Sequence, residues 1–161
     1  EITNGNCEDG LNIIRGTGSI NSLIAVNSSN DALDIDFSDL KISKIGVTSA
    51  GNDCLDLSFG KYEIEEIDIN DCGDKAISVG EKSKLVINEL NVLNSKIGVA
   101  SKDSSKTKLE NGYFKHLDTC LSAYNKKQEF FGGLIEIKNF DCLNSINKMY
   151  VDDISTINFK N

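Results

Sequence analysis

Residues 31–52 read DALDIDFSDLKISKIGVTSAGN, and residues 53–74 read DCLDLSFGKYEIEEIDINDCGD. Both stretches are 22 residues long and place aliphatic, acidic and small residues at matching offsets. Residues 9–30 have the same length and pattern, and residues 75–95 repeat it to within one residue. A fixed period in this range is typical of a repeat protein.

Two segments of each repeat alternate apolar and polar residues, which is the pattern of a β-strand with one buried face. The first aliphatic pairs of the early repeats are Leu11/Ile13, Leu33/Ile35, Leu55/Leu57 and Ile77/Val79. Strands at constant offsets predict an all-β fold, a right-handed parallel β-helix (solenoid) of about seven coils with ~22 residues per coil. We expect residues 1–161 to form a single domain of a longer or processed chain, because the first residue is Glu1.

Composition restricts the function classes. The chain has a formal net charge of −8, so nucleic acid is not expected as a partner. No apolar run approaches the roughly 20 residues of a membrane span, so membrane insertion is not expected. The absence of proline suits coils whose backbone N–H groups all pair with a neighbouring coil.

Polar residues mark the corners between the expected strands. Asparagine tolerates the left-handed backbone conformation that a tight corner requires. The asparagines expected at corners are Asn27, Asn30, Asn70, Asn94 and Asn144. The longest irregular insert, residues 125–133 (NKKQEFFGG), is expected to form a wall beside one face. His116 has no partner suggested by position and is expected at the surface.

Outward positions of the first strand carry charge. Asp34 and Asp56 occupy one such column, and Lys102 follows in later coils, so the face changes from acidic to basic along the chain. Asp9, Asp31, Asp53 and Lys75 form a second column at the starts of these strands.

That second column has three interpretations. It is a ladder of compensating charges in which Asp53 pairs with Lys75, a functional cleft, or a calcium site on Asp9, Asp31 and Asp53. Otherwise no metal site and no cofactor are expected.

The five cysteines are Cys7, Cys54, Cys72, Cys120 and Cys142. Their spacings do not suggest zinc, since no CxxC pair occurs. Cys54 and Cys120 share a column but lie three coils apart, too far for a bridge. We therefore expect five free thiols.

Four phrases in successive coils, NDALD, GNDCLDL, DKAISVG and GVASK, resemble the motifs NTDGID, GDDCIAI, GHGISIG and RIK of the polygalacturonase family. The resemblance covers residues 28–103 and extends to the pectate-lyase-like β-helices in general. It implies a β-helix that acts on galacturonan, using aspartates on adjacent coils.

The resemblance implies roles for individual residues. Asp31 matches the aspartate of NTD and Asp53 the second aspartate of GDD, while Lys102 matches the lysine of RIK. Lys75 stands at the family's histidine. Asn52 replaces the family's general acid, and an amide cannot donate that proton.

The same region is also similar, more loosely, to β-helix segments of bacterial surface proteins, some attached to CotH-like domains. That similarity implies no reaction. Two functions therefore stay open. One is a module that binds or acts on an acidic polysaccharide or cell-surface glycan, as a hydrolase or lyase if it is an enzyme. The other is a non-catalytic structural or adhesive solenoid of a surface protein.

Both functions imply an extracellular or cell-surface location. The catalytic candidates are Asp31, Asp53, Lys75 and Lys102. The ligand-binding candidates are Asp34, Asn52, Asp56 and Tyr124. Tyr124, Phe130 and Phe131 flank the insert, where an aromatic ring stacks on a sugar or shields the end of the core.

Overall fold

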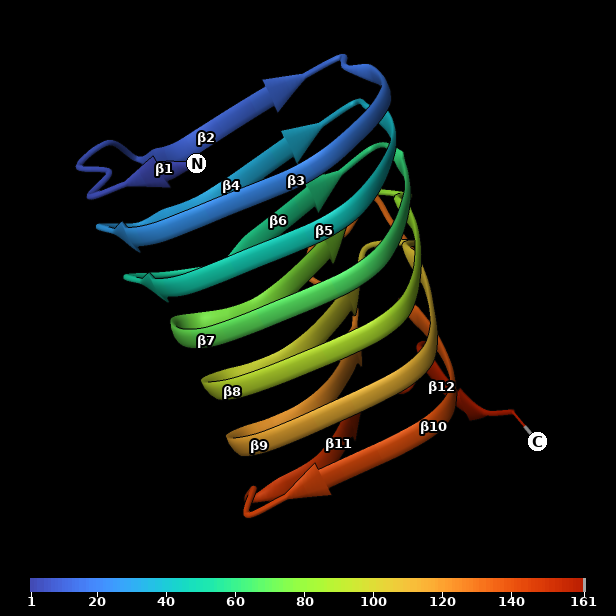
Figure 1. Cartoon of the computed structure of the whole chain (residues 1–161). Coiled ribbons are helices and arrows are strands. Elements are labelled where there is room, and N and C mark those ends of the chain that lie inside the picture. The colour runs from blue at the N-terminus through green and yellow to red at the C-terminus, as the bar shows by residue number, and fades with distance from the viewer. Residues whose placement is uncertain (161) are drawn as a thin grey trace.

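The computed structural model describes residues 1–160, and every regular element in that range is a β-strand. The strands wind into a parallel β-solenoid of about seven turns (Figure 1), which confirms the predicted fold class. The strands are β1 (Ile2–Thr3), β2 (Asp9–Ile14), β3 (Thr17–Ser28), β4 (Asp31–Asp36), β5 (Asp39–Ala50), β6 (Leu55–Ser58), β7 (Lys61–Gly80), β8 (Lys84–Lys102), β9 (Lys106–Tyr124), β10 (Leu134–Leu143), β11 (Asn147–Val151) and β12 (Thr156–Phe159).

Each coil has three faces, which the coil of β4 and β5 illustrates. Residues 31–36 form face 1, residues 39–42 form face 2, and residues 44–50 form face 3. The buried positions shift phase between Ile42 and Ile45, so β5 bends between faces 2 and 3. In β7, β8 and β9 one continuous strand runs from face 2 through face 3 to face 1 of the next coil.

Parallel pairing in register stacks equivalent residues of successive coils. Leu33 pairs with Leu55, and Leu55 pairs with Ile77. Ile42 pairs with Ile64 on face 2, and Val47 pairs with Ile69 on face 3. All of these side chains are buried, so the aliphatic rows predicted from the repeat form one continuous core. Burial of these rows is the main stabilisation of the solenoid.

Left-handed residues turn the corner that follows face 3. Asn27, Asn94 and Asn144 have φ values of 58°, 54° and 50°, as predicted. Asn30 also lies at a corner, in the bend after β3, but without a positive φ. At the corner beside Asn70, the left-handed residue is Asp71 instead. His116, with φ of 61°, takes the same corner position in its own coil and is exposed, as expected.

Glycines allow two corners to stack closely. A Cβ atom on Gly51 would lie 2.1 Å from the Ser29 carbonyl oxygen, and one on Gly73 would lie 2.0 Å from the Gly51 carbonyl oxygen. Any side chain there would therefore force the coils apart.

The expectation of five free thiols is wrong. Cys54 bonds to Cys72 across its own coil, with Cα atoms 5.7 Å apart, and Cys120 bonds to Cys142, with Cα atoms 6.2 Å apart. Cys7 alone is free. Each bridge connects face 1 to face 3 through the interior of a coil. The prediction compared only cysteines in the same column, such as Cys54 and Cys120, and therefore missed these pairs.

Residues 1–160 contain no helix, and hence none long and apolar enough to cross a membrane.

Candidate functional site

In the charged column at the starts of the face 1 strands, aspartate side chains hydrogen-bond to the backbone of the next coil. The Asp31 Oδ1 atom accepts hydrogen bonds from the Asn52 side-chain amide at 2.7 Å and from the Asp53 backbone N–H at 2.9 Å. One coil later, Asp53 Oδ1 accepts from the Lys75 backbone N–H at 2.9 Å. Each carboxylate thus holds the backbone of the following coil.

Asp53 and Lys75 also form the predicted ion pair, with 3.4 Å between Nζ and Oδ1. Burial raises the pKa of Asp53, and the Lys75 charge partly opposes the rise. The structure therefore brings together four predicted site residues, Asp31, Asn52, Asp53 and Lys75. Their contacts with one another hold adjacent coils together.

A hollow of about 330 Å³ lies beside this column on the outward side of face 1. We call it the face 1 groove. Its lining residues are Asp34, Asp36, Phe37, Asp56, Ser58, Phe59, Glu81, Lys102, Lys126 and Lys127. Three predicted site residues, Asp34, Asp56 and Lys102, meet here.

The floor of the groove holds two charged groups with unused hydrogen-bonding capacity. Lys102 is only 6% exposed, and among the residues that the structure describes its ammonium makes one hydrogen bond, to the Ser78 hydroxyl at 2.7 Å. An ammonium has three donors. The Oδ1 atom of Asp56 is buried and has no protein partner in residues 1–160. Such groups cost free energy unless something bonds to them.

The acidic side of the groove favours protonated carboxyl groups. Burial and the neighbouring carboxylates of Asp36, Asp9, Asp56 and Asp31 raise the pKa of Asp34 to about 7. The Asn12 amide donates to Asp34 at 2.8 Å. Burial also raises the pKa of Asp56, with partial opposition from the Lys102 charge.

The predicted wall is the insert of residues 125–133, of which Lys126 and Lys127 reach the groove. Buried Asp103 fixes it, because Asp103 Oδ1 accepts from the backbone N–H groups of Lys126 and Lys127, each at 2.8 Å. Lys127 also pairs with Glu81, which accepts from the Ser58 hydroxyl at 2.7 Å. Burial opposes ionisation of Glu81, but these two partners hold its pKa below the usual range.

Aromatic rings border the groove at the corner after face 1. The rings of Phe37 and Phe59 stack with centroids 4.8 Å apart and planes 2° apart, and they are 49% and 41% exposed. Phe130 of the insert meets Phe59 edge-on at 6.2 Å. Phe37 and Phe59 have φ values of 51° and 49°, which are strained for bulky residues. Strain of this kind concentrates at functional sites.

Sequence reasoning missed Phe37, Phe59, Glu81 and Lys127. The two phenylalanines lie 22 residues apart, directly after the face 1 strand, so extending the outward columns by one position identifies them. The repeat does not predict the contact of Glu81 with Lys127. Lys127 belongs to the insert, whose position depends on contacts outside the repeat.

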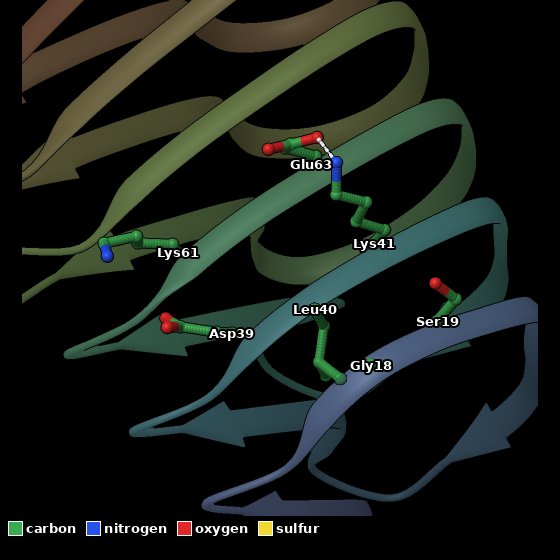
Figure 2. A pocket seen from close by; sticks show the side chains of 7 residues that line it. All are labelled: Gly18, Ser19, Asp39, Leu40, Lys41, Lys61 and Glu63. Carbon is green, nitrogen blue, oxygen red and sulfur yellow. Dashed lines mark ion pairs between the residues drawn. The ribbon is translucent and has the colours of Figure 1, made fainter.

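A second hollow, of about 300 Å³, lies on face 2 and offers less chemistry (Figure 2). Lys41 and Glu63 in its lining form an ion pair at 2.8 Å, and both side chains are mostly exposed. Figure 2 shows these side chains directed at each other along the sheet surface. Lys41 and Glu63 neutralise each other, and the other charged side chains of the lining, Asp39 and Lys61, are exposed, so this hollow offers no buried charged group to a ligand.

Tyr124, the remaining candidate, does not line the face 1 groove. It lines a third hollow, of about 440 Å³, on the late coils of face 1.

In residues 1–160, no group of three or more His, Cys, Asp or Glu side chains is arranged to hold a metal ion. The calcium site on Asp9, Asp31 and Asp53 stays a prediction.

No protein-family model, curated protein or solved structure matches the chain.

Proposed function

We propose that this protein binds an acidic polysaccharide in the face 1 groove and holds it without cleaving it. The observation that carries the proposal is the groove floor, where the Lys102 ammonium has unused donors beside the unpartnered Oδ1 atom of Asp56. A sugar hydroxyl accepts one hydrogen bond and donates another, so it satisfies both groups together.

The border and the charge distribution of the groove suit a sugar acid. The apolar side of a sugar ring packs against an aromatic ring, and Phe37 and Phe59 offer an exposed stacked pair. Lys102 and Lys126 provide positive charge for a uronate carboxylate, while Lys127 is already paired with Glu81. Partial protonation of Asp34 near neutral pH reduces repulsion of an anionic chain.

Binding without turnover follows from the use of the predicted catalytic pair. The carboxylates of Asp31 and Asp53 are occupied by the scaffold, because each accepts a hydrogen bond from a backbone N–H of the following coil. Asn52 stands where the polygalacturonases have their acid. The resemblance to that family supports a uronic-acid ligand more than it supports hydrolysis.

Two disulfides support the proposed extracellular or cell-surface location, since such bonds persist in oxidising compartments.

A structural or adhesive solenoid is the second candidate. The observation that favours it is the self-compensation of charge on the outer faces, as in the pairs Lys41–Glu63 and Lys44–Glu66.

Calorimetric titration against a panel of uronic-acid polymers, with neutral glucans beside them, separates the candidates. We expect binding to at least one uronic-acid polymer, and a loss of about tenfold or more in Lys102→Met, because a charged hydrogen bond is removed. Lys106→Met, an exposed lysine on face 2, is the matched control and leaves binding unchanged.

A product assay on the same panel measures reducing ends and unsaturated uronates. No binding to any polymer contradicts the proposal and favours the structural solenoid. Turnover that Asp53→Asn abolishes shows instead that the protein is an enzyme.

A further inference from the structure

The hollow on the late coils of face 1 has the features of a second binding site. It encloses about 440 Å³ between β8, β9 and β11, and the aromatic rings of Tyr124 and Tyr150 contribute to its lining together with Ile97 and Met149. The 42% and 55% exposure of Met149 and Tyr150 leaves apolar surface open to solvent.

Polar side chains also line this hollow. Ser122 is only 3% exposed, and Thr119, Asn125 and Asn147 also contribute to the lining. Hydroxyl and amide groups among aromatic and apolar side chains are the usual composition of a small-molecule site. The end of the hollow is fixed, because Asp152 accepts a hydrogen bond from the Asn125 backbone N–H at 2.7 Å.

The two hollows of face 1 are neighbours. Lys102 on the groove floor pairs in register with Tyr124 of the second hollow, and Asn125 of the second hollow directly precedes Lys126 of the groove. Asp56 and Tyr150 occupy the same outward column, four coils apart. At a coil spacing of about 4.8 Å, this separation is roughly 19 Å.

We infer that the Tyr124–Tyr150 hollow is a second subsite for the same ligand, which is then an oligosaccharide long enough to extend along the solenoid axis from Asp56 to Tyr150. The inference rests on the proposed function of the face 1 groove. One sugar ring stacks on the tyrosines and directs a hydroxyl at Ser122, while another occupies the groove floor at Lys102.

The test compares ligand lengths. Calorimetric titrations use galacturonic acid oligomers from the disaccharide to the hexasaccharide, with neutral cello-oligosaccharides of the same lengths as a second series. The variants are Tyr150→Ala and Ser122→Ala in the second hollow, Lys102→Met in the groove, and Tyr113→Ala on face 3 as the matched control.

We expect the hexasaccharide to bind more tightly than the disaccharide. Tyr150→Ala lowers hexasaccharide affinity about five- to tenfold through loss of stacking, and leaves disaccharide affinity within about twofold. Ser122→Ala acts in the same direction, and Tyr113→Ala has no effect. Lys102→Met weakens both lengths.

Equal affinity for the two lengths, or a hexasaccharide affinity unchanged in Tyr150→Ala, overturns the second subsite while the proposed function stands. Absence of binding at every length in both series overturns the proposed function and the subsite together.

Discussion

Asp34 shows how a single residue couples the groove to pH. Its carboxyl group is half-buried at the acidic end of face 1, where burial and four neighbouring carboxylates raise its pKa from 3.8 to about 7. In the unfolded chain the pKa returns to the ordinary value. The folded protein therefore binds more protons than the unfolded chain between about pH 4 and pH 7.

This difference predicts the sign of a pH effect. The contribution of Asp34 to the free energy of unfolding decreases as pH rises from about 4 through 7, because charging the group is harder in the fold. Asp34→Asn removes the contribution and keeps an acceptor for Asn12. The variant should gain stability relative to the wild type as pH increases from 4 to 8.

Urea denaturation at several pH values measures the effect, with Asp153→Asn at an exposed turn as the control. If the free energies of unfolding of the wild type and Asp34→Asn differ by the same amount at every pH in this range, the account of Asp34 is contradicted.

The insert of residues 125–133 is the element that completes the groove, and one buried side chain determines its position. Asp103 lies at a left-handed corner with φ of 54° and accepts two backbone N–H bonds from Lys126 and Lys127. Since the other contacts of the insert are near the surface, these bonds are expected to dominate its local stability.

Asp103→Ala should release the insert and lower the stability of the protein by about 1–3 kcal/mol, because the two N–H groups lose a charged acceptor. Trypsin should then cleave faster after Lys126 and Lys127. Asp103→Asn keeps an acceptor oxygen and should resemble the wild type more closely. Similar cleavage rates in wild type and Asp103→Ala would show that other contacts hold the insert.

The strands and the insert differ in how far sequence predicts them. Rows such as Leu33–Leu55–Ile77 and the pair Asp53–Lys75 follow from the period, since stacking in register makes residues one repeat apart neighbours. The insert breaks this rule. Cys142 pairs in register with Phe114, 28 positions earlier, so the repeat no longer identifies partners in the last coils.

The groove was predicted in part for the same reason. Asp34 and Asp56 follow from one outward column, and Lys102 follows from a separate outward column further along the strand. The reach of Lys102 to Ser78, and of Lys127 to Glu81, depends on long side chains that cross coils, which spacing alone does not specify.

At the scale of the whole molecule, the two disulfides link faces that the repeat does not join. The Cys54–Cys72 bridge closes a separation of 18 residues and the Cys120–Cys142 bridge one of 22. Loops of this size correspond to a stabilisation of about 3 kcal/mol for each bridge through restriction of the unfolded chain.

Reduction should therefore lower the free energy of unfolding by about 3 kcal/mol per bridge. Guanidinium denaturation with and without reductant measures the total, and the double variants Cys54→Ala/Cys72→Ala and Cys120→Ala/Cys142→Ala separate the two contributions. Cys7→Ala is the control and should change nothing. Identical midpoints in reduced and oxidised protein contradict this role of the bridges.

The groove and its neighbouring hollow both lie on face 1, whereas faces 2 and 3 carry paired charges such as Lys41–Glu63. The central claim is that face 1 binds a polysaccharide. The most direct test is an NMR titration of the ¹⁵N-labelled protein with a galacturonic acid hexasaccharide. We predict shifts of the amide signals of residues 34–37, 56–59 and 122–127, with faces 2 and 3 unchanged. Unperturbed spectra, or shifts centred on the Lys41–Glu63 hollow of face 2, would contradict the account.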